Sequence, residues 1–394
     1  MNDLKTLHRY HAQRIAVITQ APFPVGNVST MRIISYLKSL VKIDIYAYVL
    51  VYCPTRMASG IQVSEGVYEG INFQYATDIT WKKYNLLYKI VYLLKGLFNS
   101  LSYLKSQNIS TIILYGDNLF IVNLFYWLYT RLKGIRYIGD RSELPLEKIR
   151  KSCLKLYFYG LKQKMFDGII VMTKRLVQFY SRYSSKQDYL FMLPMTIDSE
   201  RFQGVQKVYI HDHYIATVFG THNRDGLFET IKSFEIYCKK GGSFNLRLIG
   251  DFENMPNKSS LEALINNSDY KSRIIILGKQ ANEVVPSILF NASLLVTTPN
   301  YYSSGGFPTK LGEYMLSGVP IIATDVGEVS NYIIPDVDML LCKPGDIEGI
   351  SSAMLMLERN SNFARKIALN AERKAKDVFC ADSYINELVK FLFK

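Results

Sequence analysis

A single carboxylate, Glu313, lies in a short segment whose neighbours are typical of a phosphate-binding turn. The run GGFPTKLGEYMLSGVPIIATD, residues 305–325, begins with two glycines and a proline, continues as an amphipathic helix and ends at a glycine before an apolar strand. Glycines leave backbone N–H groups bare at a helix N-terminus, where an anion is stabilised. A glutamate one turn later can accept two hydroxyls of a ribose. The run suggests a nucleotide site, and the alternative is a surface glutamate on an ordinary helix.

Short apolar runs alternate with helical segments along the whole chain. This pattern is typical of parallel sheets that are covered by helices on both faces. We predict strands at 14–20, 44–53, 111–116, 135–140, 168–173, 189–194, 214–220, 244–251, 273–278, 293–299, 320–325 and 339–344. The segment 199–213 has no strong pattern and is interpreted as a linker. The sequence therefore predicts an α/β protein of two doubly wound domains, with ligands at the carboxyl ends of the strands.

Length and composition are those of a folded protein with two cores. The chain has 394 residues, of which 48% are hydrophobic and 21% charged. The apolar run at 119–130 is shorter than the roughly 20 residues that cross a bilayer, and residues 1–14 lack the apolar core of a signal peptide. Five scattered cysteines show no metal or disulfide spacing and are interpreted as buried thiols. We expect a cytoplasmic chain that does not span a membrane.

Positive charge is concentrated in the first half of the chain. Residues 1–205 hold 27 Lys and Arg against 13 Asp and Glu, a net of +14, whereas residues 206–394 have a net of −1. Such asymmetry favours an anionic partner for the first half. A helix predicted at 146–164 would carry a basic stripe of Lys148, Lys151, Lys155 and Lys162, which is either a membrane-facing surface or a solvated face. No nucleic-acid-binding motif accompanies the charge, so we expect no nucleic acid partner.

The run GFPTKLGEYMLSGVPIIATDVGE, residues 306–328, resembles the donor-site signature of glycosyltransferase family 4, also called glycosyl transferases group 1. The resemblance is close over residues 214–345 and extends to the first half only in the order of its elements. It implies a GT-B fold of two Rossmann-like domains that face a central cleft. It also implies a retaining transferase that takes a sugar from a nucleotide diphosphate sugar.

The family pattern implies that Glu313 binds the ribose of the donor. It also has an earlier glutamate, at a position that is Gly305 in this chain. The sugar-binding side chain must therefore differ, and the candidates are Tyr301, Tyr302, Ser303 and Ser304.

A second match, FGTHNRDGLFETIKSF at 219–234, resembles the loop in which an Arg and a Lys hold the donor diphosphate. Thr221 and Asp225 stand at those two positions, which leaves Arg224 as the local cation and Lys310 as a candidate compensator. Arg224 has the alternative of being an ordinary loop arginine. The expected donor site comprises Gly26, Asn27, Arg224, Gly305, Gly306, Phe307, Pro308, Thr309, Lys310 and Glu313.

Three carboxylates that follow strands of the first half are candidate catalytic residues. Asp117 follows the strand at 111–116, and Asp140 and Glu143 follow the next. Each could accept a proton from the acceptor hydroxyl or stabilise positive charge on the sugar. The two aspartates could instead cap helices. In the loop 21–32 the resemblance makes Gly26 and Asn27 donor contacts and Arg32 a weaker one, and Ser29 is the predicted helix N-cap.

The resemblance and the residues together predict residues 1–200 as a basic acceptor-binding domain and 201–375 as the nucleotide-sugar-binding domain. Residues 376–394 are predicted to be a helix that returns to the first domain. The predicted acceptor is a glycan, carried on a lipid, in bacterial surface polysaccharide synthesis such as lipopolysaccharide or capsule. The protein would work peripherally on the inner face of the cytoplasmic membrane.

No cofactor and no metal are expected, and the Asp336–Asp338 triplet is attributed to chance because it precedes a strand of the second domain. Two other functions stay open. One is a sugar-nucleotide 2-epimerase, which shares the architecture but gives no reason for the basic first half. The other is a non-catalytic nucleotide- or glycan-binding partner of a transferase, which the missing glutamate and altered cations would suit.

Overall fold

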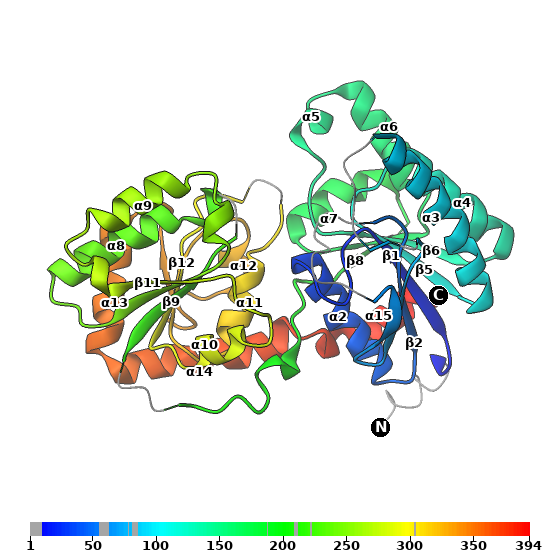
Figure 1. Cartoon of the computed structure of the whole chain (residues 1–394). Helices are drawn as coiled ribbons and strands as arrows, with labels where there is room; N and C mark the ends of the chain where they lie inside the picture. The colour runs from blue at the N-terminus through cyan, green and yellow to red at the C-terminus, as the bar shows by residue number, and fades with distance from the viewer. Residues whose placement is uncertain are drawn as a thin grey trace. The chain divides into compact units, whose positions relative to one another are not determined.

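The computed structural model describes residues 10–54, 63–77, 79–80, 86–186, 188–208, 212–220, 223–302 and 305–394. The chain divides into two compact units (Figure 1). Unit 1 comprises Met1–Asp198, Ser304–Gly306 and Cys380–Lys394, and unit 2 comprises Ser199–Ser303 and Phe307–Phe379.

Unit 1 is built on an eight-stranded sheet with the order β3-β4-β2-β1-β5-β6-β7-β8. All its neighbouring strands are parallel except β3 and β4. The strands are β1 (Arg14–Thr19), β2 (Tyr46–Val51), β3 (Glu65–Tyr68), β4 (Ile71–Tyr75), β5 (Thr111–Tyr115), β6 (Arg136–Arg141), β7 (Gly168–Val171) and β8 (Leu190–Met192). The helices are α2 (Val28–Val41), α3 (Leu86–Ser106), α4 (Phe120–Lys133), α5 (Glu147–Arg150), α6 (Cys153–Gln163), α7 (Lys174–Tyr180) and α15 (Ile385–Leu392).

Unit 2 is built on a six-stranded, fully parallel sheet with the order β11-β10-β9-β12-β13-β14. Its strands are β9 (Tyr214–Val218), β10 (Asn245–Ile249), β11 (Ile274–Gly278), β12 (Leu294–Thr297), β13 (Ile321–Thr324) and β14 (Leu340–Cys342). Its helices are α8 (Leu227–Lys239), α9 (Lys258–Asn266), α10 (Val285–Phe290), α11 (Thr309–Leu316), α12 (Val329–Tyr332), α13 (Ile347–Arg359) and α14 (Ser361–Val378).

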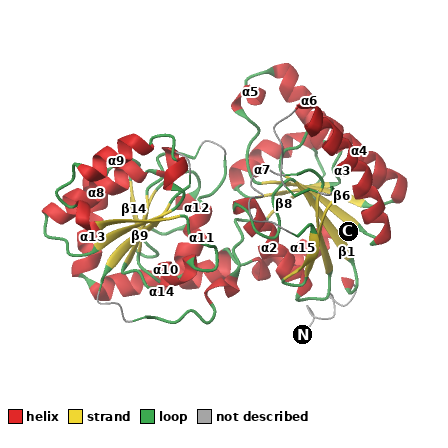
Figure 2. Ribbon diagram, viewed as in Figure 1, coloured by secondary structure: helices red, strands yellow, loops and turns green. Residues whose placement is uncertain are grey.

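Helices lie on both sides of each sheet (Figure 2). The apolar side chains on both faces of the central strands are therefore buried, and β5, β7, β12 and β13 are buried at every position. Every predicted strand is present, and the α/β prediction of two doubly wound domains is confirmed. In such sheets the loops after the strands gather at one edge, and these loops carry the candidate site residues.

The C-terminal segment packs in unit 1. Leu388 and Leu392 of α15 are fully buried in the core of that unit, and Phe391 stacks on Phe191 with ring centroids 5.3 Å apart. The hydroxyl of Thr111, at the start of β5, donates a hydrogen bond to the Leu392 carbonyl at 3.0 Å. Residues 380–394 are thus part of unit 1, although the chain reaches them only after unit 2.

One hairpin was not predicted, and two local predictions were wrong. The hairpin of β3 and β4 was missed, because its sequence EGVYEGINFQY mixes polar residues into an edge of the sheet. The helix predicted at 146–164 is two helices, because the Ser152 side chain caps a new helix by accepting the Lys155 N–H. The N-cap of α2 is Asn27, whose side chain accepts the Ser29 N–H at 3.0 Å, rather than Ser29.

Candidate functional site

Helix α11 carries Glu313. It starts just after Pro308, whose fixed φ suits a helix start and whose side chain leaves the first-turn N–H groups uncapped. It ends before Gly318, which has φ 64° as a left-handed cap requires. The Tyr314 hydroxyl accepts the Val218 N–H at 2.6 Å and so joins the helix to the carboxyl end of β9. Both predicted helix ends are confirmed.

Glu313 is paired with an arginine. Arg201 Nη1 lies 2.9 Å from Glu313 Oε1, and the two side chains are 12% and 23% exposed. Arg201 comes from the short 3₁₀ helix Ser199–Phe202, and its other terminal nitrogen donates to the Asn282 carbonyl at 2.9 Å. The arginine is therefore held from two sides, and it fixes the carboxylate that the sequence assigns to a ribose.

Lys310 lies one turn before Glu313 and contacts the loop after β9. Its Nζ is 2.9 Å from Asp225 Oδ2. Burial lowers the pKa of Lys310, the Asp225 and Glu313 carboxylates oppose that shift, and the Arg224 cation adds to it. Asp225 also accepts the Gly220 N–H, which ties the lysine to the end of β9. Two residues from separate matched motifs, Asp225 and Lys310, are thus direct neighbours.

Arg224 has its guanidinium 4.8 Å from the centroid of the Tyr302 ring, a cation–π contact between the loops after β9 and β12. The Arg224 carbonyl accepts the Asn300 N–H at 2.8 Å. Gly226 follows in the left-handed region with φ 73°, and a Cβ there would lie 1.7 Å from the Thr298 carbonyl oxygen. Only glycine lets the two loops approach this closely. We use the name charged cluster of unit 2 for five residues: Arg201, Arg224, Asp225, Lys310 and Glu313.

The residues before α11 do not all present side chains to solvent. Gly305 and Gly306 are buried and belong to unit 1, where the Gly305 carbonyl accepts the Thr173 hydroxyl at 2.6 Å. Gly305 has φ 72°, so a side chain at this position would strain the backbone. Phe307 is 2% exposed and packs in unit 2 against Tyr332 and Phe379. Ser303 and Ser304 lie outside the described residues, as does Thr221.

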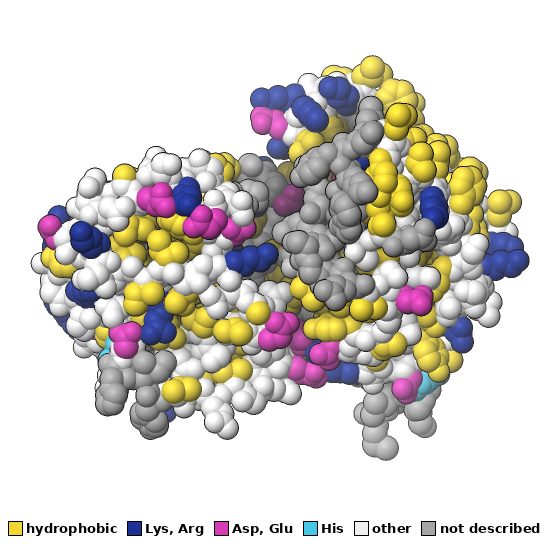
Figure 3. All heavy atoms as spheres, in the orientation of Figure 1, with side chains coloured by type: hydrophobic (Ala, Val, Ile, Leu, Met, Phe, Trp, Pro, Cys, Tyr) yellow, Lys and Arg dark blue, Asp and Glu magenta, His cyan; other side chains and the backbone are white. Residues whose placement is uncertain are grey.

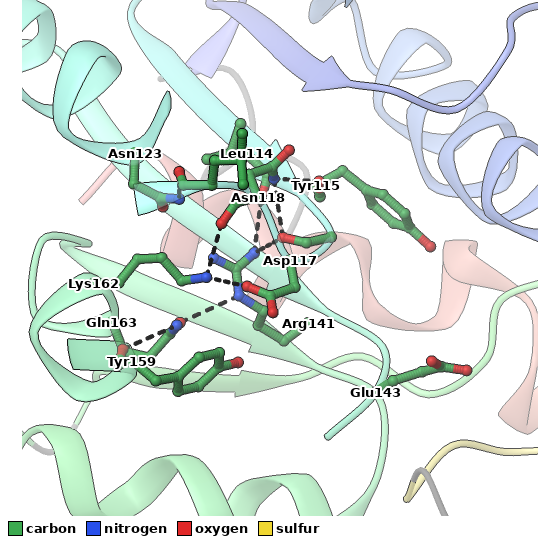
Figure 4. A network of polar contacts seen from close by, with 12 residues as sticks. Leu114, Tyr115, Asp117, Asn118, Asn123, Arg141, Glu143, Tyr159, Lys162 and Gln163 are labelled. Atoms are coloured by element: carbon green, nitrogen blue, oxygen red, sulfur yellow. Dashed lines mark hydrogen bonds and ion pairs between the residues drawn. The ribbon is translucent and has the colours of Figure 1, made fainter. Parts of the chain in front are cut away.

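Asp117 belongs to a network of polar contacts at the carboxyl end of β5 (Figure 4). Its carboxylate is 38% exposed and forms an ion pair with Lys162, which is 8% exposed. Lys162 also donates to the Asn118 carbonyl at 2.8 Å, and burial lowers the pKa of this lysine. Lys162 therefore does not lie on the basic stripe predicted for residues 146–164, which is a further correction.

Arg141 closes the same network from the end of β6. It is 1% exposed, and its Nη1 donates to the carbonyls of Leu114, Gly116 and Asp140. Its Nε donates to Gln163 Oε1 at 3.2 Å, and the guanidinium lies 4.8 Å from the Phe166 ring centroid. A buried arginine with this many carbonyl partners fixes the strand end from which Asp117 projects.

Asp140 and Glu143 are close in sequence but lie in different surroundings. Asp140 is fully buried, 3.6 Å from Arg32 Nε, and burial raises the pKa of its carboxyl while Arg32 and Arg141 oppose the shift. Arg32 is also fully buried and donates to the carbonyls of Leu193 and Pro194 at 3.1 and 2.7 Å. Glu143 is exposed, and Figure 4 shows its carboxylate pointing away from the Asp117 network.

The glycine loop after β1 has a defined structure in unit 1. A Cβ on Gly26 would lie 2.5 Å from the Pro22 carbonyl oxygen and 2.2 Å from the Thr30 hydroxyl, so the loop requires glycine. The Asn27 side chain is engaged in capping α2. Both residues therefore shape the loop through the backbone and the cap.

Sequence reasoning missed Arg201, Arg141 and Lys162. Arg201 lies in the segment interpreted as a patternless linker, and an isolated arginine there gives no periodic signal. Arg141 and Lys162 looked like part of the surplus positive charge, which is a surface feature in most proteins. In the sequence, these cations could have been noticed because they lie near the carboxylates predicted at strand ends. Which cations are buried, however, depends on how the elements pack.

The second half of the chain matches a known family. Residues 206–374 match the family model of glycosyl transferases group 1. The match includes Arg224, Asp225, Lys310 and Glu313, and it ends before the C-terminal segment 380–394.

Curated relatives are distant and are matched in part. N-acetyl-alpha-D-glucosaminyl L-malate synthase of Bacillus anthracis is 27% identical over 142 residues, which cover 36% of this chain and 35% of that protein. The amylovoran biosynthesis glycosyltransferase AmsK of Erwinia amylovora is 22% identical over 204 residues, which cover 50% of this chain and 49% of that one. The chain thus spans less than half the length of these relatives.

Solved structures share the whole fold. Sucrose-phosphate synthase of Thermosynechococcus elongatus is similar over 97% of this chain and 99% of its own, with a TM-score of 0.74 and 16% identity. HepE of Anabaena, in complex with UDP, is similar over 96% and 99%, with a TM-score of 0.72 and 12% identity. The fold is therefore GT-B. Within the described ranges, no helix has the length and apolar composition that crossing a bilayer requires.

Proposed function

We propose, from the premise that residues 206–374 are a glycosyl transferases group 1 domain on a GT-B fold, that this chain is a metal-independent glycosyltransferase. It would transfer a sugar from a nucleotide diphosphate sugar to a hydroxyl of a glycan acceptor, with retention of configuration. The observation that carries the proposal is the charged cluster of unit 2, which places a fixed carboxylate, Glu313, one helical turn from a cation, Lys310.

The donor would bind in two parts. The Glu313 carboxylate accepts hydrogen bonds from the ribose hydroxyls, since the contact with Arg201 holds it in a fixed orientation. The diphosphate is bound by Lys310, Arg224 and the uncapped N–H groups of α11. Lys310 must then exchange its contact with Asp225 for one with phosphate. Gly305 has no side chain that could bind the donor sugar. Polar residues near Gly305 would therefore bind the hydroxyls of the sugar.

The reaction breaks the bond between the anomeric carbon and the diphosphate oxygen, and the acceptor oxygen forms the new bond on the same face. Negative charge grows on the leaving diphosphate and is stabilised by the two cations and the helix N-terminus. The proton of the acceptor hydroxyl leaves with the diphosphate or passes to a carboxylate of unit 1. Asp117 and Glu143 reach solvent and remain candidates for that role, whereas we assign Asp140 a structural role as the buried partner of Arg32.

The acceptor would be a lipid-linked glycan in a bacterial surface polysaccharide pathway, such as lipopolysaccharide or capsule. Two relatives support this setting, because AmsK is named for amylovoran biosynthesis and CapM of Staphylococcus aureus for capsular polysaccharide biosynthesis. The net charge of +14 in residues 1–205 supports work at an anionic membrane surface, which would be the inner face of the cytoplasmic membrane.

The test is release of nucleotide by purified protein from a panel of UDP-, GDP-, TDP- and ADP-sugars, with and without a lipid extract of its own source. We expect release with one donor class and with the extract, and a loss of at least about 100-fold in Glu313→Ala, as for removal of a key donor contact. Glu262→Ala, which changes an exposed glutamate of α9, is the matched control and should keep full activity.

Other outcomes would favour the two rival functions. Conversion of a UDP-sugar to its epimer without release and without extract would establish an isomerase. Nucleotide-sugar binding that depends on Glu313, but without turnover on any donor, would establish a non-catalytic partner of a transferase.

A further inference from the structure

Three neighbouring helices of unit 1 present apolar side chains to solvent. Helices α3, α4 and α6, of 21, 14 and 11 residues, hold twelve of the 28 exposed large hydrophobic residues among the described ones. The most exposed are Leu132 at 84%, Leu87 at 73%, Leu154 at 67%, Phe98 at 63% and Tyr157 at 63%. Scattered single residues of this kind are normal, whereas a concentrated set marks an interaction surface.

The three helices form one continuous face. Helix α4 contacts both α3 and α6, and Phe98 of α3 packs edge to face on Phe125 of α4 with centroids 5.7 Å apart. Figure 1 shows the three helices side by side, and Figure 3 shows hydrophobic side chains gathered over that part of unit 1, with Lys and Arg among them. We call this surface the α3–α4–α6 face.

The apolar residues follow the outward stripe of each helix. On α3 they recur at residues 87, 90, 91, 94 and 98, and on α4 at 120, 121, 128 and 132, which is the spacing of one helical face. Inward-facing positions such as Leu97, Leu104 and Val122 are buried at 0–2%. These helices are thus apolar toward the core and also toward solvent, which an ordinary surface helix is not.

The charge of the face identifies its partner. The three helices contain seven Lys and Arg and no Asp or Glu. Of these cations, Lys162 is buried against Asp117 and Arg131 forms an ion pair with Asp167. A second copy of the chain would bring cations against cations. A nucleic acid would match the cations and leave the leucines exposed to water. An anionic lipid surface satisfies both, because headgroup phosphates bind the lysines and the acyl boundary buries the apolar stripes.

We propose that the α3–α4–α6 face docks on an anionic lipid bilayer and inserts its apolar stripes at the level of the headgroups. The inference deepens the proposed function, because it names the surface by which the protein would approach a lipid-linked acceptor. It differs from attraction by diffuse positive charge, since it requires apolar contact as well.

The test is partitioning of the full-length protein onto phosphatidylcholine vesicles with and without phosphatidylglycerol, measured by flotation at low and high salt. The apolar variant is Val91→Ser, Leu132→Ser, Leu154→Ser. All three residues are exposed, so folding should be preserved. The matched control, Val208→Ser, Ile334→Ser, Leu369→Ser, removes exposed aliphatic residues from unit 2. A charge variant, Lys105→Gln, Lys133→Gln, Lys155→Gln, removes cations from the face.

We expect binding to the anionic vesicles, a loss of at least about tenfold in the apolar variant, and no more than about a twofold change in the control. Each lysine removed should weaken partitioning about fivefold, and salt should weaken it further. The proposal is overturned if the protein does not float at low salt or if the control loses as much as the apolar variant. It is also overturned if the apolar variant instead abolishes a dimer seen by sedimentation velocity.

Insertion is measured separately from attraction with Trp127 of α4. The chain has two tryptophans, so Trp81→Phe leaves Trp127 as the reporter. Lipids brominated in the acyl chain should quench its fluorescence, and binding without quenching would contradict insertion.

Vesicle binding should be independent of nucleotide-sugar binding in unit 2. The apolar variant should keep nucleotide-sugar binding, and Glu313→Ala should keep vesicle binding, so a failure of either proposal can be assigned.

Discussion

Glu313 is not an isolated carboxylate, since Arg201 contacts it at 2.9 Å from a segment more than a hundred residues earlier in the chain. A partly buried ion pair of this kind restricts the rotamers of both side chains. The proposed donor site would therefore depend on a residue that need not touch the donor.

Arg201→Ala should weaken donor binding. The Glu313 carboxylate loses its oriented partner, and we expect the dissociation constant of the nucleotide sugar to rise about 5- to 30-fold, which corresponds to about 1–2 kcal/mol. Isothermal titration calorimetry measures this directly. Lys232→Ala removes an ion pair elsewhere in unit 2 and should leave the affinity unchanged. Equal or tighter binding by Arg201→Ala would mean that the arginine competes with the ribose.

Lys310 should give donor binding a characteristic pH dependence. Burial lowers its pKa from the ordinary 10.5, so the cation is lost at a lower pH than in an exposed lysine. In the proposed donor site the diphosphate binds the protonated form of Lys310, so donor affinity should fall as pH rises through that lowered pKa. Lys310→Arg should flatten the profile, since a guanidinium stays charged over the same range. An unchanged profile in Lys310→Arg would show that another group is responsible.

At the scale of elements, the loops after β9 and β12 are held together by a backbone approach at Gly226. The Thr298 hydroxyl donates to the Gly226 carbonyl at 2.7 Å, and the same hydroxyl lies 2.7 Å from that of Thr230 on α8. This packing sets the place of Arg224, two residues earlier, relative to Tyr302.

Gly226→Ala should destabilise unit 2 and disturb its donor loop. The new Cβ would meet the Thr298 carbonyl at 1.7 Å and would force a left-handed φ on alanine, and we expect a loss of about 2–4 kcal/mol in the free energy of unfolding. Urea denaturation provides the measurement. Gly241→Ala is the control, because Gly241 also has a positive φ but nothing lies within 4 Å, and it should cost only about 1 kcal/mol. Similar losses in the two variants would rule out the role of the close approach.

At the scale of the whole molecule, the chain leaves unit 1, forms unit 2 and returns to finish unit 1 with α15. The last helix is a structural part of the first unit, because its apolar side chains complete that core. The two units nevertheless have separate cores, so their stabilities can be changed separately.

Leu388→Ala should weaken unit 1 selectively. The side chain is fully buried, and its truncation should cost about 2–5 kcal/mol. Hydrogen exchange followed by mass spectrometry should show loss of protection in β7 and β8 and none in β9 and β10. Leu369→Ala, at a half-exposed position of α14, should change neither unit. Loss of protection in both units by Leu388→Ala would mean that they unfold together.

The sequence alone determined the class of fold and the elements that carry the candidate site. Buried strands are recognisable as short apolar runs, because both faces of a covered parallel sheet must be apolar. The backbone preferences of Pro308 and Gly318 predicted the two ends of α11. The positions of Glu313, Arg224 and Lys310 followed from the motifs on those elements.

Only the tertiary structure decided which charges turn inward and what they contact. Asp140 was predicted as a catalytic residue or a helix cap and Lys162 as part of a basic stripe, yet packing buries them against Arg32 and Asp117. Arg201 contacts Glu313 from a segment without periodicity. The outward stripes of α3, α4 and α6 were hidden for the same reason, because an apolar residue in a helix sequence does not reveal whether it faces the core or the solvent. Long-range ion pairs and the exposure of side chains depend on how the elements pack, and the local sequence does not determine that packing.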